Sequence, residues 1–420
     1  MRFRKITGLW AKYDSAIWIR VIGTALTTVT GFMIRPFLVL YLYDQMNGSV
    51  VLPMLIVGLQ PLCGIAITWF GGRWSDRFGR KPLMLIALAV QMLSMIGYIF
   101  ADHVWQYAAV SILNGMGSAL FMPAANAQIT DMVEDSRRAE VFALMHTALN
   151  VGAAAGPVLG LMMFQWNPTA VFLLSACTFL ANGLLVLFKL PETAPAKRAP
   201  GPAPAGAAAT GAAPAARTAF SWRSHKPLVL LTLCSLPVGL LYSQVETTLP
   251  LHLKTHFDDY RTVLASLLTF NGVMVIALQI WIARRTERIR SYQVLAVSQA
   301  LFAIVAIGYG YAGLIAVLFA AEFVFTIGEM AAGPHSQKAI SILAPPEQRG
   351  FYFSVYGASY LLARGIGPIL GGALLSQSSG EVLFTVLAVL IAASGFGLYR
   401  VVRGIELGHR ADRASDTLSA

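Results

Sequence analysis

Long apolar runs alternate with short charged or polar segments along most of the chain. Twelve of these runs are about 20 residues or longer, the length that an α-helix needs to cross the apolar core of a bilayer. A segment in lipid must satisfy its own backbone hydrogen bonds, so each run predicts a helix. The runs cover residues 17–43, 52–70, 82–100, 104–127, 140–163, 168–188, 227–253, 262–283, 292–310, 313–333, 350–375 and 381–399. The pattern predicts an all-α, multi-pass membrane protein with twelve transmembrane helices.

The lysines and arginines gather on one side of the predicted membrane. The loops and tails on the side of both termini hold 27 of the 31 cations, whereas the opposite loops hold Lys254 and Arg261. Cytoplasmic loops of membrane proteins carry an excess of positive charge. We therefore expect both termini in the cytoplasm.

A segment rich in Ala, Pro and Gly, residues 191–224, separates the first six runs from the last six. Such a composition cannot build a packed core, and we expect a disordered cytoplasmic linker. The predicted units are a bundle at 1–190, the linker at 191–224, a second bundle at 225–403 and a loosely ordered cytoplasmic tail at 404–420.

The two halves of the chain repeat at a constant offset of 211 residues. Pro123 and Pro334 form one such pair, and Gly156 and Gly367 form another. Because each half has six helices, both keep the same orientation, which predicts two parallel six-helix bundles related by an axis along the membrane normal. This architecture places a binding site between the bundles and lets them rock around it.

Composition excludes several classes of function. Hydrophobic residues make up 56% of the chain and charged residues 12%, whereas a soluble protein carries about 25% charged residues. The net charge of +11 lies in loops and tails, which indicates contact with anionic membrane lipids and argues against a nucleic-acid partner. The sequence contains no nucleotide-binding loop, metal-ligand cluster or hydrolytic triad. We therefore expect a protein that is not an enzyme, has no metal or cofactor, and draws its energy from an ion gradient.

Four cations and one acid crowd into residues 71–81, between the second and third apolar runs. The glycines of residues 71–81 allow a tight turn, and the charges of this segment must lie in water at the cytoplasmic surface. With Pro82 following, this turn resembles the loop signature of the major facilitator superfamily, a family of secondary transporters. The residues that carry the resemblance are Gly72, Arg73, Asp76, Arg77, Gly79 and Arg80.

The resemblance extends to the fifth run, where Gly152, Gly156, Pro157 and Gly160 look like the antiporter motif of the twelve-helix drug:H⁺ antiporter branch. Small residues four apart lie on one helix face and permit close packing of a neighbouring helix. The resemblance implies a proton-driven exporter of small molecules. The sequence departs from it at residues 114–117 of the fourth run, which lack the arginine that many relatives carry.

The resemblance also implies that Asp76 closes the cytoplasmic side by meeting the start of the eleventh helix, near Gly350. We expect Asp131, at the cytoplasmic end of the fourth helix, to bind Arg73 or Arg77 in the same network. The alternative for both acids is a solvated surface charge.

Five charged residues lie well inside apolar runs: Arg35, Glu246, Glu322, Glu329 and Arg364. A charge at the centre of a bilayer costs about 2.5–3.5 kcal/mol on insertion scales, so each is a functional candidate. We expect Glu329, which lies among small residues of the tenth helix, to carry the proton. Glu322, two helical turns earlier, is either a relay or an interfacial or structural acid. The alternative for Glu329 is a permanent structural pair with Arg364.

Arg35 and Glu246 are separated by the repeat offset of 211 residues, so they lie at matching depths in the first and seventh helices. We expect them to approach each other in one conformation and to separate in another, with protonation of Glu246 releasing Arg35. The alternative is that each bonds local groups, such as the Ser243 hydroxyl.

Aromatic, methionine and amide side chains of the runs suggest a cavity that accepts varied amphipathic solutes. The candidate lining residues are Tyr41, Asn114, Met116, Phe121, Asn126, Tyr242, Gln244, Met330 and His335. We predict a monomeric transporter of a bacterial-type inner membrane that exports hydrophobic or cationic small molecules in exchange for protons. The alternatives are an exporter of a specific metabolite or sugar and a lipid or glycolipid flippase.

Overall fold

The computed structural model describes residues 13–193, 225–345 and 348–419, and within them the regular structure is helical throughout, as predicted. The first half contains α2 (Ser15–Gln45), α3 (Val51–Phe78), α4 (Arg80–Phe100), α5 (Val104–Met132), α6 (Asp135–Trp166) and α7 (Pro168–Lys189). The second half contains α8 (Lys226–Glu246), α9 (Thr248–His256), α10 (Tyr260–Thr286), α11 (Ser291–Tyr311), α12 (Ile315–Leu343), α13 (Arg349–Gln377) and α14 (Gly380–Ser419).

The length and composition of these helices suit a membrane. In the described part of the chain, eleven helices are long and apolar enough to cross a bilayer. The described apolar stretch of α3 is shorter and covers Val51–Ile67. Most of the predicted linker, residues 194–224, lies outside the described residues.

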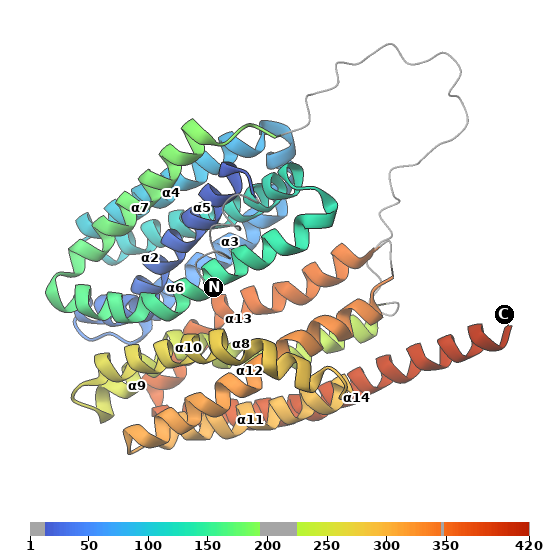
Figure 1. Cartoon of the computed structure of the whole chain (residues 1–420). Coiled ribbons are helices and arrows are strands. Elements are labelled where there is room, and N and C mark those ends of the chain that lie inside the picture. The colour runs from blue at the N-terminus through green and yellow to red at the C-terminus, as the bar shows by residue number, and fades with distance from the viewer. Residues whose placement is uncertain (1–12, 194–224, 346–347, 420) are drawn as a thin grey trace, which may run out of the picture.

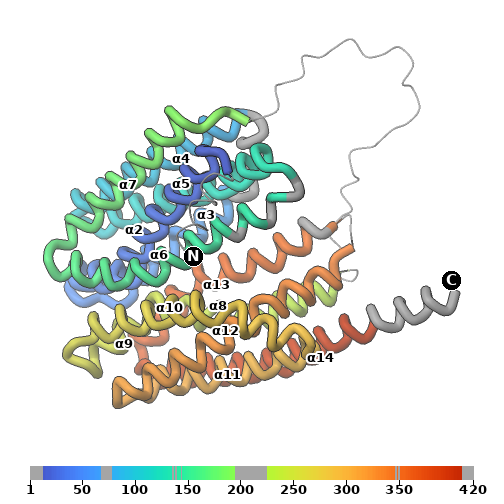
Figure 2. Tube along the Cα trace, in the orientation of Figure 1, coloured from blue at the N-terminus to red at the C-terminus, as the bar shows by residue number. Residues whose placement is uncertain are grey.

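The helices form two bundles that lie side by side (Figures 1 and 2). Helices α2 to α7 make the first bundle and α8 to α14 the second, and the bundles meet where α3 packs against α13 and α6 packs against α10. Small residues allow this close approach. A Cβ atom at Gly272 of α10 would lie 2.7 Å from Cα of Ala154, and one at Gly58 of α3 would lie 2.6 Å from the carbonyl oxygen of Gly365.

The helix boundaries reproduce the repeat seen in the sequence. Shifted by 211 residues, the bounds of α4 become those of α11, and the bounds of α5 become those of α12. The two contacts between the bundles obey the same relation, since α3 corresponds to α10 and α6 corresponds to α13. The order of the helices therefore repeats between the two bundles, and the bounds of several helices repeat as well.

The seventh predicted helix differs from the prediction because it is broken. The run at 227–253 is divided into α8 and α9 at Thr247, whose φ and ψ are −125° and −67°. Pro250 has no backbone N–H, so it cannot bond the carbonyl of Glu246 four residues earlier. The break therefore falls directly after an intramembrane charge.

The end of the chain also differs from the prediction. Helix α14 continues from Gly380 through Ser419, well beyond the predicted end of the twelfth run at residue 399. The expectation of a loosely ordered tail after Arg403 was wrong for the backbone of the described residues.

A carboxylate binds the start of α4 in the first bundle and the start of the equivalent helix, α11, in the second. In the first bundle, the backbone N–H groups of Arg80 and Lys81 donate to Glu192 over 3.0 and 3.1 Å. In the second bundle, the N–H of Ser291 donates to Glu406 over 2.9 Å. A negative charge is favourable at a helix N-terminus, where backbone N–H groups lack partners.

Binding of Glu192 corrects the predicted start of the linker. Gly79, at φ 101°, leaves room for this carboxylate, because a Cβ atom there would lie 2.6 Å from Oε2 of Glu192. Pro191 accepts a hydrogen bond from the Gln128 side chain, and the Thr193 hydroxyl donates to Asp131. Residues 191–193 are thus attached to the first bundle rather than disordered.

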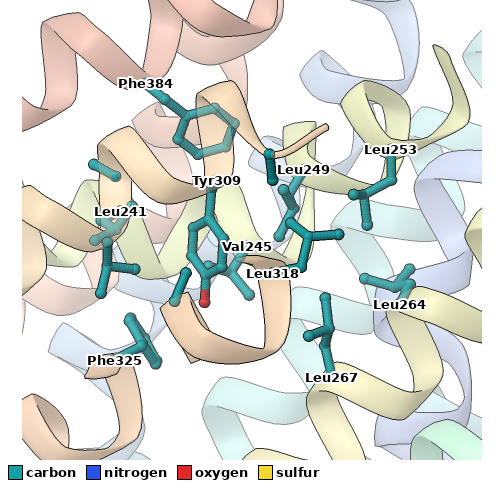
Figure 3. Packing of buried hydrophobic residues seen from close by; sticks show 14 of the residues in the cluster. Leu241, Val245, Leu249, Leu253, Leu264, Leu267, Tyr309, Leu318, Phe325 and Phe384 are labelled. Carbon is teal, nitrogen blue, oxygen red and sulfur yellow. The ribbon is translucent and has the colours of Figure 1, made fainter. Parts of the chain in front are cut away.

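The core of the second bundle is built around aromatic residues (Figure 3). Tyr309 lies between Phe384 and Phe325, with ring centroids 6.1 and 6.4 Å away. Its hydroxyl donates to Glu322 over 2.6 Å, and only 1% of Glu322 is exposed. This acid is therefore held inside the bundle, where a hydroxyl group satisfies it.

Removal of the carboxylate at the start of α11 tests its structural role. We expect Glu406→Ala to lower the free energy of unfolding by about 1–3 kcal/mol, because Glu406 is 7% exposed and the buried Ser291 N–H would lose its acceptor. Thermal unfolding of the purified protein in detergent measures the change. Glu134→Ala is the control, since Glu134 precedes α6 without a side-chain cap. Equal stability of the two variants would contradict this role.

Candidate functional site

A cavity of about 400 Å³ lies between the two bundles, with walls from α2, α3, α5, α8 and α13. Most of its surface is apolar and includes Leu38, Val57, Met122 and Leu361. A second cavity of about 500 Å³ shares some of these walls and extends into the first bundle as far as Arg20 and Phe142. The residues common to both are Arg35, Leu38, Gln60, Ser118, Met122 and Asn126.

Three charged side chains face the first cavity. Arg364 of α13 forms a hydrogen-bonded ion pair with Glu246 at the end of α8. Arg35 of α2 lines both cavities and interacts electrostatically with these two residues. Glu246 therefore pairs with Arg364 in this conformation, not with Arg35 as one expected state required. The alternative pair of Glu329 with Arg364 is not formed either.

Helix packing holds the ion pair in place. Gly367 and Gly371 let α13 approach α8 closely, because a Cβ atom at either position would lie within 2.6 Å of a side-chain oxygen of α8. The Gln244 amide donates to the Gly367 carbonyl over 2.9 Å and accepts from the Thr248 hydroxyl over 2.8 Å. Glu246 follows this contact directly and precedes the helix break.

A second polar network surrounds Glu329 inside the second bundle. The Asn271 amide donates to Glu329 Oε2 over 3.1 Å and to the Thr326 hydroxyl over 2.9 Å. The side chain of Tyr242 also interacts electrostatically with Glu329. Neither Glu329 nor Glu322 is among the described residues that line the two cavities.

Two tyrosines interact electrostatically with residues of both networks. Tyr360 of α13 interacts with Arg364 and with Tyr242, which in turn interacts with Glu329. The guanidinium carbon of Arg364 lies 5.7 Å from the centroid of the Tyr360 ring. The two networks are therefore coupled electrostatically.

Ion pairs between the bundles close one end of the molecule. Asp44, near the end of α2, lies 2.8 Å from Nζ of Lys254 on α9 and 3.4 Å from a nitrogen of Arg261 on α10. The cavities contact α2 from Arg20 to Leu38, so they end before this closure at Asp44. Sequence reasoning missed Asp44, although Lys254 and Arg261 are the two cations that it had placed apart from the rest.

Known proteins are similar to this chain in sequence and in fold. A sequence model described as Major Facilitator Superfamily matches residues 21–336 and 231–416. The chain belongs to this superfamily. It is 35% identical to the uncharacterized MFS-type transporter YhjO of Bacillus subtilis (strain 168), over 94% of this chain and 95% of that protein.

More distant superfamily members have names that state an activity. The chain is 26% identical to a Na(+), Li(+), K(+)/H(+) antiporter of Planococcus maritimus, covering 85% of this chain and 89% of the antiporter. It is 24% identical to the multidrug resistance protein MdtH of Salmonella choleraesuis (strain SC-B67), covering 84% of each. In structure it is similar to the peptide transporter POT in complex with sulfate, with a TM-score of 0.75, 17% identity, and coverage of 94% and 95%.

The superfamily loop motif is described only in part. Its backbone is helical to Phe78 at the end of α3, and α4 begins at Arg80, so the tight turn expected over residues 71–81 is limited to Gly79. The surroundings of Gly72, Arg73, Asp76, Arg77 and Gly350 lie outside the description, so the expected contacts of Asp76 near Gly350 and of Asp131 with Arg73 or Arg77 stay predictions. Among the described residues, Asp131 pairs with Arg80, whose Nε lies 3.2 Å from Oδ2 of the acid.

The glycines of the fifth-helix motif pack against α2. Cβ atoms at Gly152, Gly156 and Gly160 would lie 2.4–2.5 Å from atoms of Thr28, Phe32 and Met33. Pro157 is buried on the same helix, α6. The motif therefore joins two helices of the first bundle, while α6 also contacts α10 of the second.

The nine predicted cavity residues divide into groups. Asn114, Phe121 and Asn126 line the cavities, and Asn114 accepts a hydrogen bond of 2.6 Å from Gln60. The other predicted residues are not among the lining residues. Gln244, Met330 and His335 are buried, Tyr41 packs on Phe172, Tyr242 packs on Phe325, and Met116 lies half-buried on α5.

A double-mutant cycle tests which arginine is the partner of Glu246. We expect Glu246→Gln and Arg364→Gln to be coupled by about 1 kcal/mol or more in thermal unfolding, because each single change leaves an uncompensated charge. The matched control is the cycle of Glu246→Gln with Arg35→Gln, for which we expect the smaller coupling. Larger coupling to Arg35 would contradict the observed pair.

Proposed function

We propose that the protein is a secondary active transporter that exports amphipathic small molecules in exchange for protons. In this proposal, twelve helices span the inner membrane, the termini lie in the cytoplasm, and the two bundles rock around the cavity between them. The observation that carries it is the ion pair of Glu246 with Arg364 in the cavity wall, with Arg35 facing the same space. The names of two relatives, a multidrug resistance protein and an H⁺ antiporter, support export and proton exchange.

The described conformation suggests how access alternates. The Asp44 pairs close one end, and the cavities extend toward the end of α2 at which the chain begins. We propose that this state is open to the cytoplasm. Rocking of the bundles would break the Asp44 pairs and close the other end, as expected for two domains that share a central site.

Protonation would bias this equilibrium through Glu246. An ionised Glu246 attracts Arg364 and also Arg35, which belong to opposite bundles. It therefore holds α2 and α13 near α8, and a protonated Glu246 would release both arginines. A ligand or proton shifts a conformational equilibrium only by as much as its free energy differs between the states.

Glu329 remains our proposed proton carrier, with Glu322 as a relay. Glu329 accepts a hydrogen bond from the Asn271 amide, which can stabilise the carboxylate between proton transfers. Tyr242 interacts electrostatically with Glu329 and with Tyr360, and Tyr360 does so with Arg364. A change in the charge of Glu329 would therefore alter the electrostatic environment of Arg364 in the cavity wall.

The charged residues of the cavity wall determine which substrate charge is favoured. The wall carries two arginines and one glutamate, which disfavours the cationic substrates suggested by the sequence. We propose that neutral or weakly acidic amphipathic solutes are preferred, with apolar walls for their bodies and the Gln60–Asn114 pair for polar groups. A sugar would need more polar groups, and a lipid would need a groove open to the bilayer.

Transport in proteoliposomes with an imposed pH gradient tests the function. We expect gradient-driven movement of an anionic or neutral dye, faster than that of a cationic dye, a sugar or a labelled lipid. Glu329→Gln should abolish dependence on the gradient while dye binding persists, and the exposed Glu287→Gln should behave as the unchanged protein does. Transport that is indifferent to the gradient would contradict proton exchange.

A further inference from the structure

Two histidines and a glutamate meet at the end of the second bundle, away from both cavities. His252 and His256 lie one turn apart on α9, and Glu381 is the second residue of α14. One possible ligand atom of each lies within 4.8 Å of the others. We propose that these three residues bind a divalent transition-metal ion such as Zn²⁺. This inference does not rest on the proposed function.

Hydrogen bonds leave one ring nitrogen of each histidine free for the metal. Nε2 of His252 lies 3.2 Å from the Gly310 carbonyl, so Nε2 carries the proton and Nδ1 has the lone pair. Nδ1 of His256 lies 3.0 Å from the His252 carbonyl and 2.8 Å from the Thr255 hydroxyl, which itself donates to that carbonyl. Nδ1 therefore carries the proton and Nε2 has the lone pair. A histidine that binds a metal characteristically donates its other N–H to a carbonyl or carboxylate in this way.

The spacing of the free atoms suits a tetrahedral ion. Nε2 of His256 lies 3.3 Å from Oε1 of Glu381. Two ligands about 2.0–2.1 Å from a tetrahedral Zn²⁺ are separated by about 3.3 Å. Two imidazoles and a carboxylate are a known zinc ligand set, and water would take the fourth position.

The surroundings fix the inner ligand and leave the outer ones accessible. His252 is 5% exposed and packs beside Phe384, with ring centroids 5.8 Å apart. Gly380 makes room for it, because a Cβ atom there would lie 1.9 Å from Nδ1 of His252. The side chains of His256 and Glu381 are 37% and 32% exposed, so an ion can enter from solvent.

A bound ion would connect α9 to α14. Helix α9 is the short segment after the break at Thr247, and its Lys254 pairs with Asp44 of the other bundle. The metal would therefore fix the segment that closes this end of the molecule. The site also explains why two histidines face each other with ring centroids 4.4 Å apart.

Titration of the purified, tag-free protein with Zn²⁺ tests the proposal. We expect one ion per chain by calorimetry, a higher melting temperature with Zn²⁺, and a Co²⁺ absorption spectrum typical of tetrahedral coordination. His256→Ala and Glu381→Gln should each weaken binding at least about tenfold.

The control variant is His103→Asn, which keeps a side chain able to cap α5 and should bind Zn²⁺ as the unchanged protein does. Failure of the unchanged protein to bind one ion would overturn the proposal. So would binding in His256→Ala and Glu381→Gln that equals the control.

Discussion

The structure depends on how a charged carboxylate is satisfied inside an apolar assembly. Glu246 lies at the end of a helix that Pro250 breaks, and Arg364 reaches it from α13. An unpaired charge in such surroundings has a high desolvation free energy. A partner of opposite charge offsets it only while the two helices stay close. The glycines of α13 and the Gln244 hydrogen bonds keep them close. Packing and electrostatics therefore stabilise the same arrangement.

Arg35 makes the packing of the two bundles depend on the charge of Glu246. It faces the same cavity from the opposite bundle, so Glu246 attracts one arginine from each bundle. The pseudo-symmetry explains why Arg35 and Glu246 line the same cavity, because equivalent helices of two parallel bundles reach the same depth. A carboxylate between two arginines can link proton binding to the relative position of the bundles. The Asp44 pairs at the closed end are the contacts that such a movement must break.

The sequence predicted the helical class, the superfamily and the internal repeat. The length of the apolar runs indicates membrane-spanning helices, and the constant offset between matching residues indicates a duplication. The sequence did not name Arg364 as the partner of Glu246, because the residue that approaches a carboxylate in a given conformation depends on helix rotation and packing. The approach of Arg35 to Glu246 in another conformation stays a prediction. The pair of Asp131 with Arg80 was likewise not foreseen from the sequence. Pro250 alone does not predict the break after Glu246, because continuous helices such as α5 and α12 also contain a proline. The role of Glu192 depends on how the chain leaves α7.

Distance measurement between spin labels tests the central claim most directly. Labels at Gln45 and Asp258, with the three native cysteines replaced, report on the closed end of the molecule. The account predicts that acidification increases the population with a longer label separation, and that Glu246→Gln shows this longer separation at every pH. A pH response that is unchanged in Glu246→Gln would contradict the account.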